Sequence, residues 1–355
     1  MKIASFFSGA GGLDLGFTNV GFDLAFANDN WKGCWETFEK NHGISINKKS
    51  IAEINSNEIP DVVGFVGGPP CQSWSLAGSM RGIDDERGKL FYNYIKLIAE
   101  KQPLFFLAEN VAGMLSPKHK PEFMKIIEAF KEIGYNVSFK LLNVKDFEVP
   151  QERKRIIVVG YHEKMGKNFE FPEPSNKKVD LREAIGDLPE PIKASEKNKT
   201  NGNKTSLPNH EYMNGGFSTM YMSRNRVRNW EEVSFTIQAG GRHAPLHPQA
   251  PKMKVVGKDV QEFIKGKEHL YRRLSVRECA RIQTFPDNFV FYYNDVVDGY
   301  KMIGNAVPVK FAEAIAKTIM SDLKEIKNSQ SILIRNPSQQ GLVRLRLSNT
   351  EQLHH

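Results

Sequence analysis

Cysteine is scarce in this sequence of 355 residues. Only Cys34, Cys71 and Cys279 occur, an odd and widely spaced set that contains no CxxC pair. Such a set argues against a disulfide framework and against a zinc site made of thiolates, so we expect no bound metal. The cysteine usage fits a reducing compartment best, and we expect a cytoplasmic protein.

Long apolar runs are also missing. No stretch approaches the ~20 apolar residues that span a bilayer, and the apolar run in MKIASFFSGAGG is too short for a secretory signal. These absences argue against a membrane function. What the chain has is a globular composition, 40% hydrophobic, with a formal net charge of +8. The positive balance favours polyanionic partners, although it is equally common in proteins that never bind nucleic acid.

The first part of the chain, residues 1–165, alternates short apolar runs with amphipathic stretches, which is typical of βαβ units on a mainly parallel sheet. The fold class is therefore expected to be α/β, with a doubly wound, Rossmann-like sheet. We expect strands over residues 2–7, 23–27, 62–67, 104–108, 136–143 and 155–161, and helices over residues 91–101 and 121–133.

The chain then changes character. Residues 166–270 are rich in Pro, Asn, Lys and Gly and have few periodic runs, which predicts a smaller, loop-rich domain. Helical periodicity returns over residues 275–283 and 309–326. We therefore expect residues 271–326 to pack back onto the first domain, whose sheet would be built from both ends of the chain. Residues 327–355 show no sustained pattern and end in His-His, which predicts a weakly ordered tail.

A glycine-rich turn, FFSGAGGL over residues 6–13, follows the first expected strand and opens a helix. Glycines there let a ligand approach the backbone and the helix N-terminus. The turn by itself leaves NAD, S-adenosylmethionine and no ligand as alternatives. Asp29 follows the next expected strand, where an acidic residue often binds the hydroxyls of a ribose, although an Asp in that place is more often a helix cap.

Cys71 stands in GGPPCQS, directly after another apolar strand. It would lie at the carboxyl edge of the sheet, where open α/β folds bind ligands. A lone cysteine is usually an inert core residue, but Gly-Pro-Pro is a poor core segment, and its prolines would preorganise the sulfur. Glu109 ends a further strand and would share this cleft, unless it is a cap. Arg153 and Arg155 alternate into a strand and would point to one face, or form a solvated charge run.

Six blocks occur in the order FSGAGGLDLGF, GGPPCQSWS, ENVAGM, QERKRIIVVG, RRLSVRECARIQTFP and GNAVPV. This series resembles the bacterial C5-cytosine-specific DNA methyltransferases and covers the chain to about residue 325. The resemblance implies an S-adenosylmethionine-dependent methyltransferase domain at residues 1–165 and a target-recognition domain at residues 166–270. It also implies S-adenosylmethionine as cofactor, S-adenosylhomocysteine as product and double-stranded DNA as partner.

The resemblance, carried over residue by residue, also implies a cofactor pocket. Its members would be Phe7, Gly9, Gly11, Gly12, Leu13, Asp29, Asn30, Ser50, Ile51, Pro70, Asn305 and Val307. Two positions depart from the family pattern. Asn30 stands where an aromatic residue often stacks on adenine, with Trp31 one place later. Ser50 stands where an Asp commonly meets the adenine amino group, which implies weaker binding or a substitute such as Asn47.

Covalent catalysis is implied by the same resemblance. Cys71 would add to carbon 6 of cytosine, because carbon 5 is too electron-poor to accept a methyl cation unaided. Glu109 would protonate or hydrogen-bond ring nitrogen 3. Arg153 and Arg155 would favour the thiolate and hold the base carbonyl or a phosphate. The cytosine has to flip out of the duplex, and residues 72–89 are expected to form a lid over it.

Segments EKNKTNGNK, PNHEY and MSRNRVRNW in the variable region further resemble the HaeIII-type branch, which methylates the inner cytosine of GGCC. Arginine reads guanine through two hydrogen bonds in the major groove, so arginines are the expected base readers, with at least one of them on phosphate instead. The expected DNA-binding residues are Ser73, Arg87, Arg224, Arg226, Arg228 and Arg242.

Three other functions compete with this one. A tRNA cytosine-5 methyltransferase is the nearest rival, although the Cys-Phe-Thr tripeptide of that branch is absent. A nicotinamide-dependent dehydrogenase would leave Pro70, Cys71 and Glu109 without a role. The third is a catalytically idle DNA-binding regulator. We further expect a monomer and, from the family, a cognate restriction endonuclease acting on the same site.

Overall fold

The computed structural model describes the backbone of residues 1–70 and 86–335, and the side chains of residues 1–70 and 89–328. Several predicted features lie outside these described residues: Cys71, Ser73, the side chain of Arg87, the expected lid up to residue 85 and the tail beyond residue 335.

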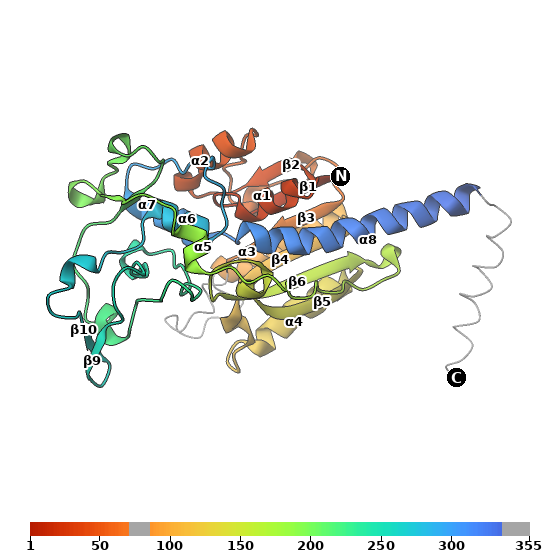
Figure 1. The fold of residues 1–355 in the computed structure, drawn as a ribbon. Helices are drawn as coiled ribbons and strands as arrows, with labels where there is room; N and C mark the ends of the chain where they lie inside the picture. The colour runs from red at the N-terminus through yellow and green to blue at the C-terminus, as the bar shows by residue number, and fades with distance from the viewer. Residues whose placement is uncertain (71–85, 336–355) are drawn as a thin grey trace.

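A six-stranded sheet forms the centre of the molecule (Figure 1). Its strands are β1 (Lys2–Phe6), β2 (Asp23–Asn28), β3 (Gly64–Gly67), β4 (Phe105–Val111), β5 (Tyr135–Asn143) and β6 (Lys154–His162), in the order β2-β1-β3-β4-β6-β5. Strands β1 to β4 are parallel, whereas β6 runs antiparallel to both of its neighbours. The predicted strands and the mainly parallel, doubly wound α/β class are confirmed.

The sheet is not built from both ends of the chain, so that prediction is wrong. Within the described ranges, all strands of this sheet lie between residues 2 and 162. The C-terminal part returns as a helix instead, α8 (Val309–Arg335), which packs on α1 (Gly12–Asn19) and the sheet. Residues 327–335, where the sequence shows no sustained pattern, continue the backbone of α8.

Alternating side chains of the strands build a separate core on each face of the sheet. In β1, Ile3 packs into the core that contains Phe17 of α1 and Phe311 of α8. Its neighbour Ala4 belongs to the opposite core. That core is covered by α3 (Glu86–Lys101) and α4 (Lys120–Glu132), which confirm the two predicted helices. The result is a three-layer α/β/α arrangement (Figure 1).

The segment after β6 is rich in loops, as its composition predicts. Its regular elements are short: α5 (Leu181–Ile185), β7 (Ile192–Lys193), β8 (Glu211–Tyr212), β9 (Lys254–Gly257) and β10 (Val260–Glu262). A small separate core in this segment includes Tyr221, Leu246 and Tyr271. This part of the chain therefore has its own packing.

Three further helices complete the described part of the chain: α2 (Lys32–His42), α6 (Val276–Ile282) and α7 (Val296–Asn305). Helix α6 begins where the sequence predicts, at a capping box in which Ser275 and Glu278 exchange hydrogen bonds with each other's backbone amides. None of the helices in the described ranges is both long and apolar enough to cross a membrane.

We expect Gly16→Ala to weaken the contact between α1 and α8. A Cβ at Gly16 would stand 2.8 Å from the carbonyl oxygen of Val309 and would collide with Ala312. The variant should lose about 1–3 kcal/mol of unfolding free energy, the usual cost of overpacking. Gly216→Ala is the control, because nothing lies within 4 Å of a Cβ there. Equal thermal and urea unfolding midpoints for the two variants would contradict this packing.

Candidate active site

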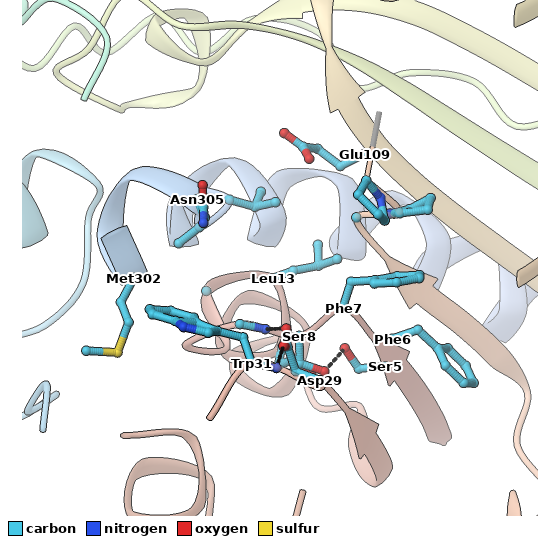
Figure 2. A pocket seen from close by; sticks show the side chains of 18 of the residues that line it. Ser5, Phe6, Phe7, Ser8, Leu13, Asp29, Trp31, Glu109, Met302 and Asn305 are labelled. Atoms are coloured by element: carbon cyan, nitrogen blue, oxygen red, sulfur yellow. Dashed lines mark hydrogen bonds between the residues drawn. The ribbon is translucent and has the colours of Figure 1, made fainter. Parts of the chain in front are cut away.

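A cavity opens at the edge of the sheet where the parallel strands β1 to β4 end (Figure 2). Strand β1 is flanked by β2 on one side and by β3 on the other, and ligands of open α/β sheets bind at such a reversal of strand order. The cavity has a volume of about 520 Å³, within the range of small-molecule sites. Its wall comes from the β1–α1 turn, from residues after β2 and β3, from the end of β4, and from the end of α7 with the segment that joins it to α8.

Most of the predicted pocket residues line this cavity. They are Phe7, Gly9, Gly12, Leu13, Asp29, Asn30, Pro70, Asn305 and Val307, together with the predicted catalytic Glu109. Three others lie outside the wall. A side chain at Gly11 would point into His42, Ser50 caps a short helix, and Ile51 is buried in the core beneath α3.

Several lining residues were missed from the sequence: Ser5, Ser8, Asp14, Asn110, Lys301 and Met302. Ser5, Ser8 and Asp14 lie inside or beside the glycine-rich turn, so a wider reading of that motif would have included them. Lys301 lies four residues before Asn305 on α7, and recognition of this helix would have put both on one face.

Glycine is required in the β1–α1 turn for two reasons. Gly9 and Gly11 have positive φ angles of 55° and 88°, which residues with a Cβ rarely adopt. Gly12 lies so close to the carbonyl oxygen of Val307 that any side chain would collide with it. The turn therefore depends on glycine both for its conformation and for its contact with the C-terminal segment.

Asp29 ties the end of β2 to this turn. Its two carboxylate oxygens accept the backbone amides of Gly9 and Trp31, each at 2.8 Å. Burial raises the pKa of Asp29, while these amides and the ammonium of Lys301 counteract the rise. Asp29 thus forms a turn and lines the cavity at once, and its oxygens keep lone pairs for a further donor.

Trp31 supplies an aromatic surface to the cavity wall directly after the exposed Asn30. The ammonium of Lys301 lies 4.0 Å from the centre of the Trp31 ring, a cation–π contact. Figure 2 shows Trp31 between Asp29 and Met302. The wall therefore has an aromatic side chain one residue after position 30.

Asp14 is a third acidic residue of the wall, beside Asp29 and Glu109. It is fully buried, and its oxygens make no hydrogen bond of ordinary length and angle within the described residues. Burial raises its pKa to about 7, while the nearby Ser5 hydroxyl and the amide of Asp14 partly counteract the rise, and Asp29 adds to it. The Ser5 hydroxyl in turn accepts a hydrogen bond of 2.9 Å from Ser8.

Glu109 and Arg155 form an ion pair at the edge of the cavity. Because β4 and β6 are antiparallel, Val111 near the end of β4 is paired with Arg155 near the start of β6. Arg155 Nε lies 2.8 Å from Glu109 Oε1, and the side chains are only 13% and 11% exposed. The next residue of β4, Asn110, donates a hydrogen bond of 2.9 Å to the carbonyl of Pro69. The end of β4 therefore presents a carboxylate and also holds the Gly-Pro-Pro segment.

Arg153 directly precedes β6. Burial lowers its pKa to about 9, and the charges of Arg155 and Glu109 both act on it. Arg153 is 2% exposed and donates to the carbonyls of Ile237, Gly304 and Ala306 at 2.9, 3.0 and 3.3 Å. Its guanidinium joins three segments of backbone and is not part of the cavity wall.

The four arginines expected to read DNA fall into two classes. Arg224 and Arg242 are exposed and have no hydrogen bond or ion pair within the part of the chain that the structure describes. Arg226 is buried and donates to two backbone carbonyls, whereas Arg228 forms ion pairs with two glutamates. Of these four, only Arg224 and Arg242 are available to a partner without loss of a contact to another described residue.

Comparison with known proteins supports one family. The model of the family described as C-5 cytosine-specific DNA methylase matches residues 1–321. The Type II methyltransferase M.MthTI of Methanothermobacter thermautotrophicus is 67% identical over 328 residues, which are 92% of this chain and 99% of that protein. The Type II methyltransferase M.FnuDI of Fusobacterium nucleatum is 54% identical over 334 residues, 92% of this chain and 97% of its own length.

The fold has a close counterpart among solved structures. A DNA modification methyltransferase encoded within an E. coli prophage matches with a TM-score of 0.70 at 22% identity, over 91% of this chain and 99% of that one. This likeness shows that the fold is the Rossmann-like α/β arrangement of methyltransferases.

We expect Arg153→Met to lower the unfolding free energy by roughly 2–4 kcal/mol, because it removes the charged donor of three buried carbonyls. Arg224→Met is the matched control and should stay within about 0.5 kcal/mol of the original protein, since Arg224 is exposed and makes no contact of this kind with the described residues. Urea unfolding of both variants measures the difference. If the two were equally stable, Arg153 would not hold these segments together.

Proposed function

The chain belongs to the C-5 cytosine-specific DNA methylase family, and we propose that Cys71 forms a covalent bond to the cytosine that the enzyme methylates. The enzyme is a DNA methyltransferase of the Type II restriction-modification type. One observation above all supports the covalent mechanism. A Cβ at Gly68 would stand 3.4 Å from Glu109 Oε2, so the expected acid lies beside the segment that leads into Cys71.

The cavity suits S-adenosylmethionine, the cofactor on which this family depends. Asp29 retains lone pairs for ribose hydroxyls, and Trp31 would stack on adenine in place of the aromatic residue that Asn30 replaces. The glycine-rich turn would surround the methionine part, with Asn305 and Val307 closing the pocket. When bound, the cofactor supplies an activated methyl group.

The residues of the site provide the groups that this chemistry needs. The Cys71 thiolate adds to carbon 6 of the flipped cytosine and makes carbon 5 electron-rich. Glu109 protonates or hydrogen-bonds ring nitrogen 3 and so accommodates the electron density that the addition pushes into the ring. Arg155 orients the Glu109 carboxylate through its ion pair and also donates to the carbonyl of Lys154, and the rest of its N–H groups are available to the cytosine carbonyl.

The reaction ends with the return of Cys71 to its free form. Once carbon 5 carries the methyl group, a base or water molecule takes its proton, the bond between carbon 6 and sulfur breaks to release the thiolate, and the aromatic ring is restored. Arg153 acts here only as a positioning residue, because its guanidinium is fixed on backbone carbonyls.

The proposed target is GGCC, read by a domain of residues 166–270. The segments of that region that resemble the HaeIII-type branch support this target. Among its arginines, Arg224 and Arg242 are the best candidates for guanine contacts, because both are exposed and neither is paired with another described residue. Arg226 and Arg228 shape the domain from within.

Duplex DNA, and not tRNA, is the proposed substrate, in agreement with the missing Cys-Phe-Thr tripeptide. Membership of the family removes the dehydrogenase alternative. A monomer in the bacterial cytoplasm, acting beside a restriction endonuclease of the same specificity, completes the proposal.

Two assays test this function. Labelled S-adenosylmethionine should transfer tritium to duplex DNA and not to tRNA, and bisulfite sequencing should locate the product at the inner cytosine of GGCC. With S-adenosylmethionine present, an oligonucleotide with 5-fluorocytosine at that position should stay covalently attached to the protein, because after methyl transfer the fluorine cannot leave as the proton does. Cys71→Ser should bind the oligonucleotide and form no adduct. Repeated absence of an adduct with active protein would refute the covalent step.

We expect Arg242→Ala to reduce discrimination between GGCC and single-substituted sites by about 1–3 kcal/mol, the value of one two-bond contact to guanine. Affinity for S-adenosylmethionine should not change, since Arg242 is not in the cavity wall. Arg182→Ala, which removes the same charge from another exposed position, is the control. Binding assays with matched oligonucleotides measure the effect. An equal loss for all sequences would assign Arg242 to phosphate instead.

A further inference from the structure

Asp14 is a carboxyl group in the cavity wall that the proposed mechanism does not use. It stands in the first turn of α1, lines the cavity and has no exposed surface. Neither oxygen makes a hydrogen bond of ordinary geometry within the described residues. Buried carboxylates are almost always hydrogen-bonded or paired with a cation, because desolvating an unpaired one is costly. Asp14 therefore needs an explanation beyond packing.

The nearest charged groups do not neutralise Asp14. Asp29, which follows β2, carries the same sign and raises the pKa of Asp14 further. The ammonium of Lys301 on α7 lies over the ring of Trp31 and acts on Asp29. The ammonium of Lys301 therefore stabilises the carboxylate of Asp29 and not that of Asp14.

Groups on the remaining elements around the cavity and α1 have partners of their own or are uncharged near neutral pH. His42 of α2 has a pKa lowered to about 4 by burial. Glu109 of β4 is paired with Arg155 of β6. Glu313 of α8 accepts a hydrogen bond from Asn19 at the opposite end of α1. Among the described residues, no cation is therefore paired with Asp14.

The surroundings nevertheless favour the ionised form in part. Asp14 lies near the N-terminus of a helix, where the dipole stabilises negative charge. The Ser5 hydroxyl and the backbone amide of Asp14 also lower its pKa, against the larger effect of burial. The balance leaves the pKa at about 7, so that a single added charge in the cavity can decide the protonation state.

We propose that Asp14 senses the positive charge of the cofactor: its carboxyl loses its proton when S-adenosylmethionine binds and keeps it when S-adenosylhomocysteine binds. The inference rests on the proposed cofactor. The donor has a sulfonium and an ammonium against one carboxylate, whereas the product has lost the sulfonium charge and is neutral overall. A charge in the cavity acts strongly on a carboxyl group inside a wall of low dielectric.

The direction of the pH dependence follows from linkage. A bound cation favours the carboxylate and lowers the pKa of Asp14 from about 7, so binding of the donor releases a proton. Affinity for the donor should therefore rise with pH up to this value, by at most about tenfold per pH unit, and level off above it. Affinity for the product should have a flatter profile.

Isothermal titration calorimetry tests this inference. Donor and product are titrated between about pH 6 and pH 8, each in two buffers of different ionisation enthalpy, which gives the number of protons released. The proteins are the original chain, Asp14→Asn and, as a matched control, Asp23→Asn at the exposed start of β2. The original chain and the control should release more protons with the donor than with the product, and Asp14→Asn should not.

The same design separates the ways in which the inference could fail. The amino group of the cofactor titrates equally with every variant, so a difference between variants reports on Asp14. Extra proton release that persists in Asp14→Asn would overturn the inference. If thermal unfolding shows that Asp14→Asn does not fold, the measurement on the original chain is decisive. Equal proton release with donor and product in that chain would also overturn the inference. A chain that bound neither compound would overturn the proposed cofactor and this inference together.

Discussion

The cavity exists because segments from opposite ends of the chain touch through their backbones. Gly12 opens α1 and Val307 precedes α8, and no Cβ fits between them. The same condition applies where Gly16 meets α8 and where Gly304 meets the backbone of Gln238. These contacts hold α1 against α8, and α7 against the segment around Gln238. If they opened, the glycine-rich turn would lose the surface against which a ligand is enclosed.

Residues at the ends of strands could be predicted from the sequence. Asp29 and Glu109 come at the ends of apolar runs, and parallel strands bring such positions to one edge. Lys301 was missed because α7 was missed. That helix contains Gly299 and Gly304, which lower helix propensity, yet both are needed for packing against Tyr293 and Gln238. In α7 the packing of these glycines outweighs their low helix propensity, and a single sequence does not reveal that packing.

The charge pattern was the least reliable guide. Arginines in QERKR and MSRNRVRNW look alike in sequence, but the structure divides them by environment. Arg153 and Arg226 lie inside and donate to backbone carbonyls, and Arg228 is paired with glutamates. Arg224 and Arg242 remain exposed. A guanidinium has five N–H donors, enough to satisfy several buried carbonyls at once. The positive net charge of a sequence therefore includes arginines that bond inside the protein as well as arginines that could attract a polyanion.

Adjacent residues of β4 serve two contacts, and this has a mechanical consequence. Glu109 carries the carboxylate, and Asn110 holds the carbonyl of Pro69. β4 lies inside the sheet between β3 and β6, so its displacement would carry the carboxylate and the Gly-Pro-Pro segment together. A movement of β4 would therefore shift Glu109 and the Gly-Pro-Pro segment together relative to the rest of the cavity wall. The distance between Glu109 and the Gly-Pro-Pro segment would stay the same during such a movement.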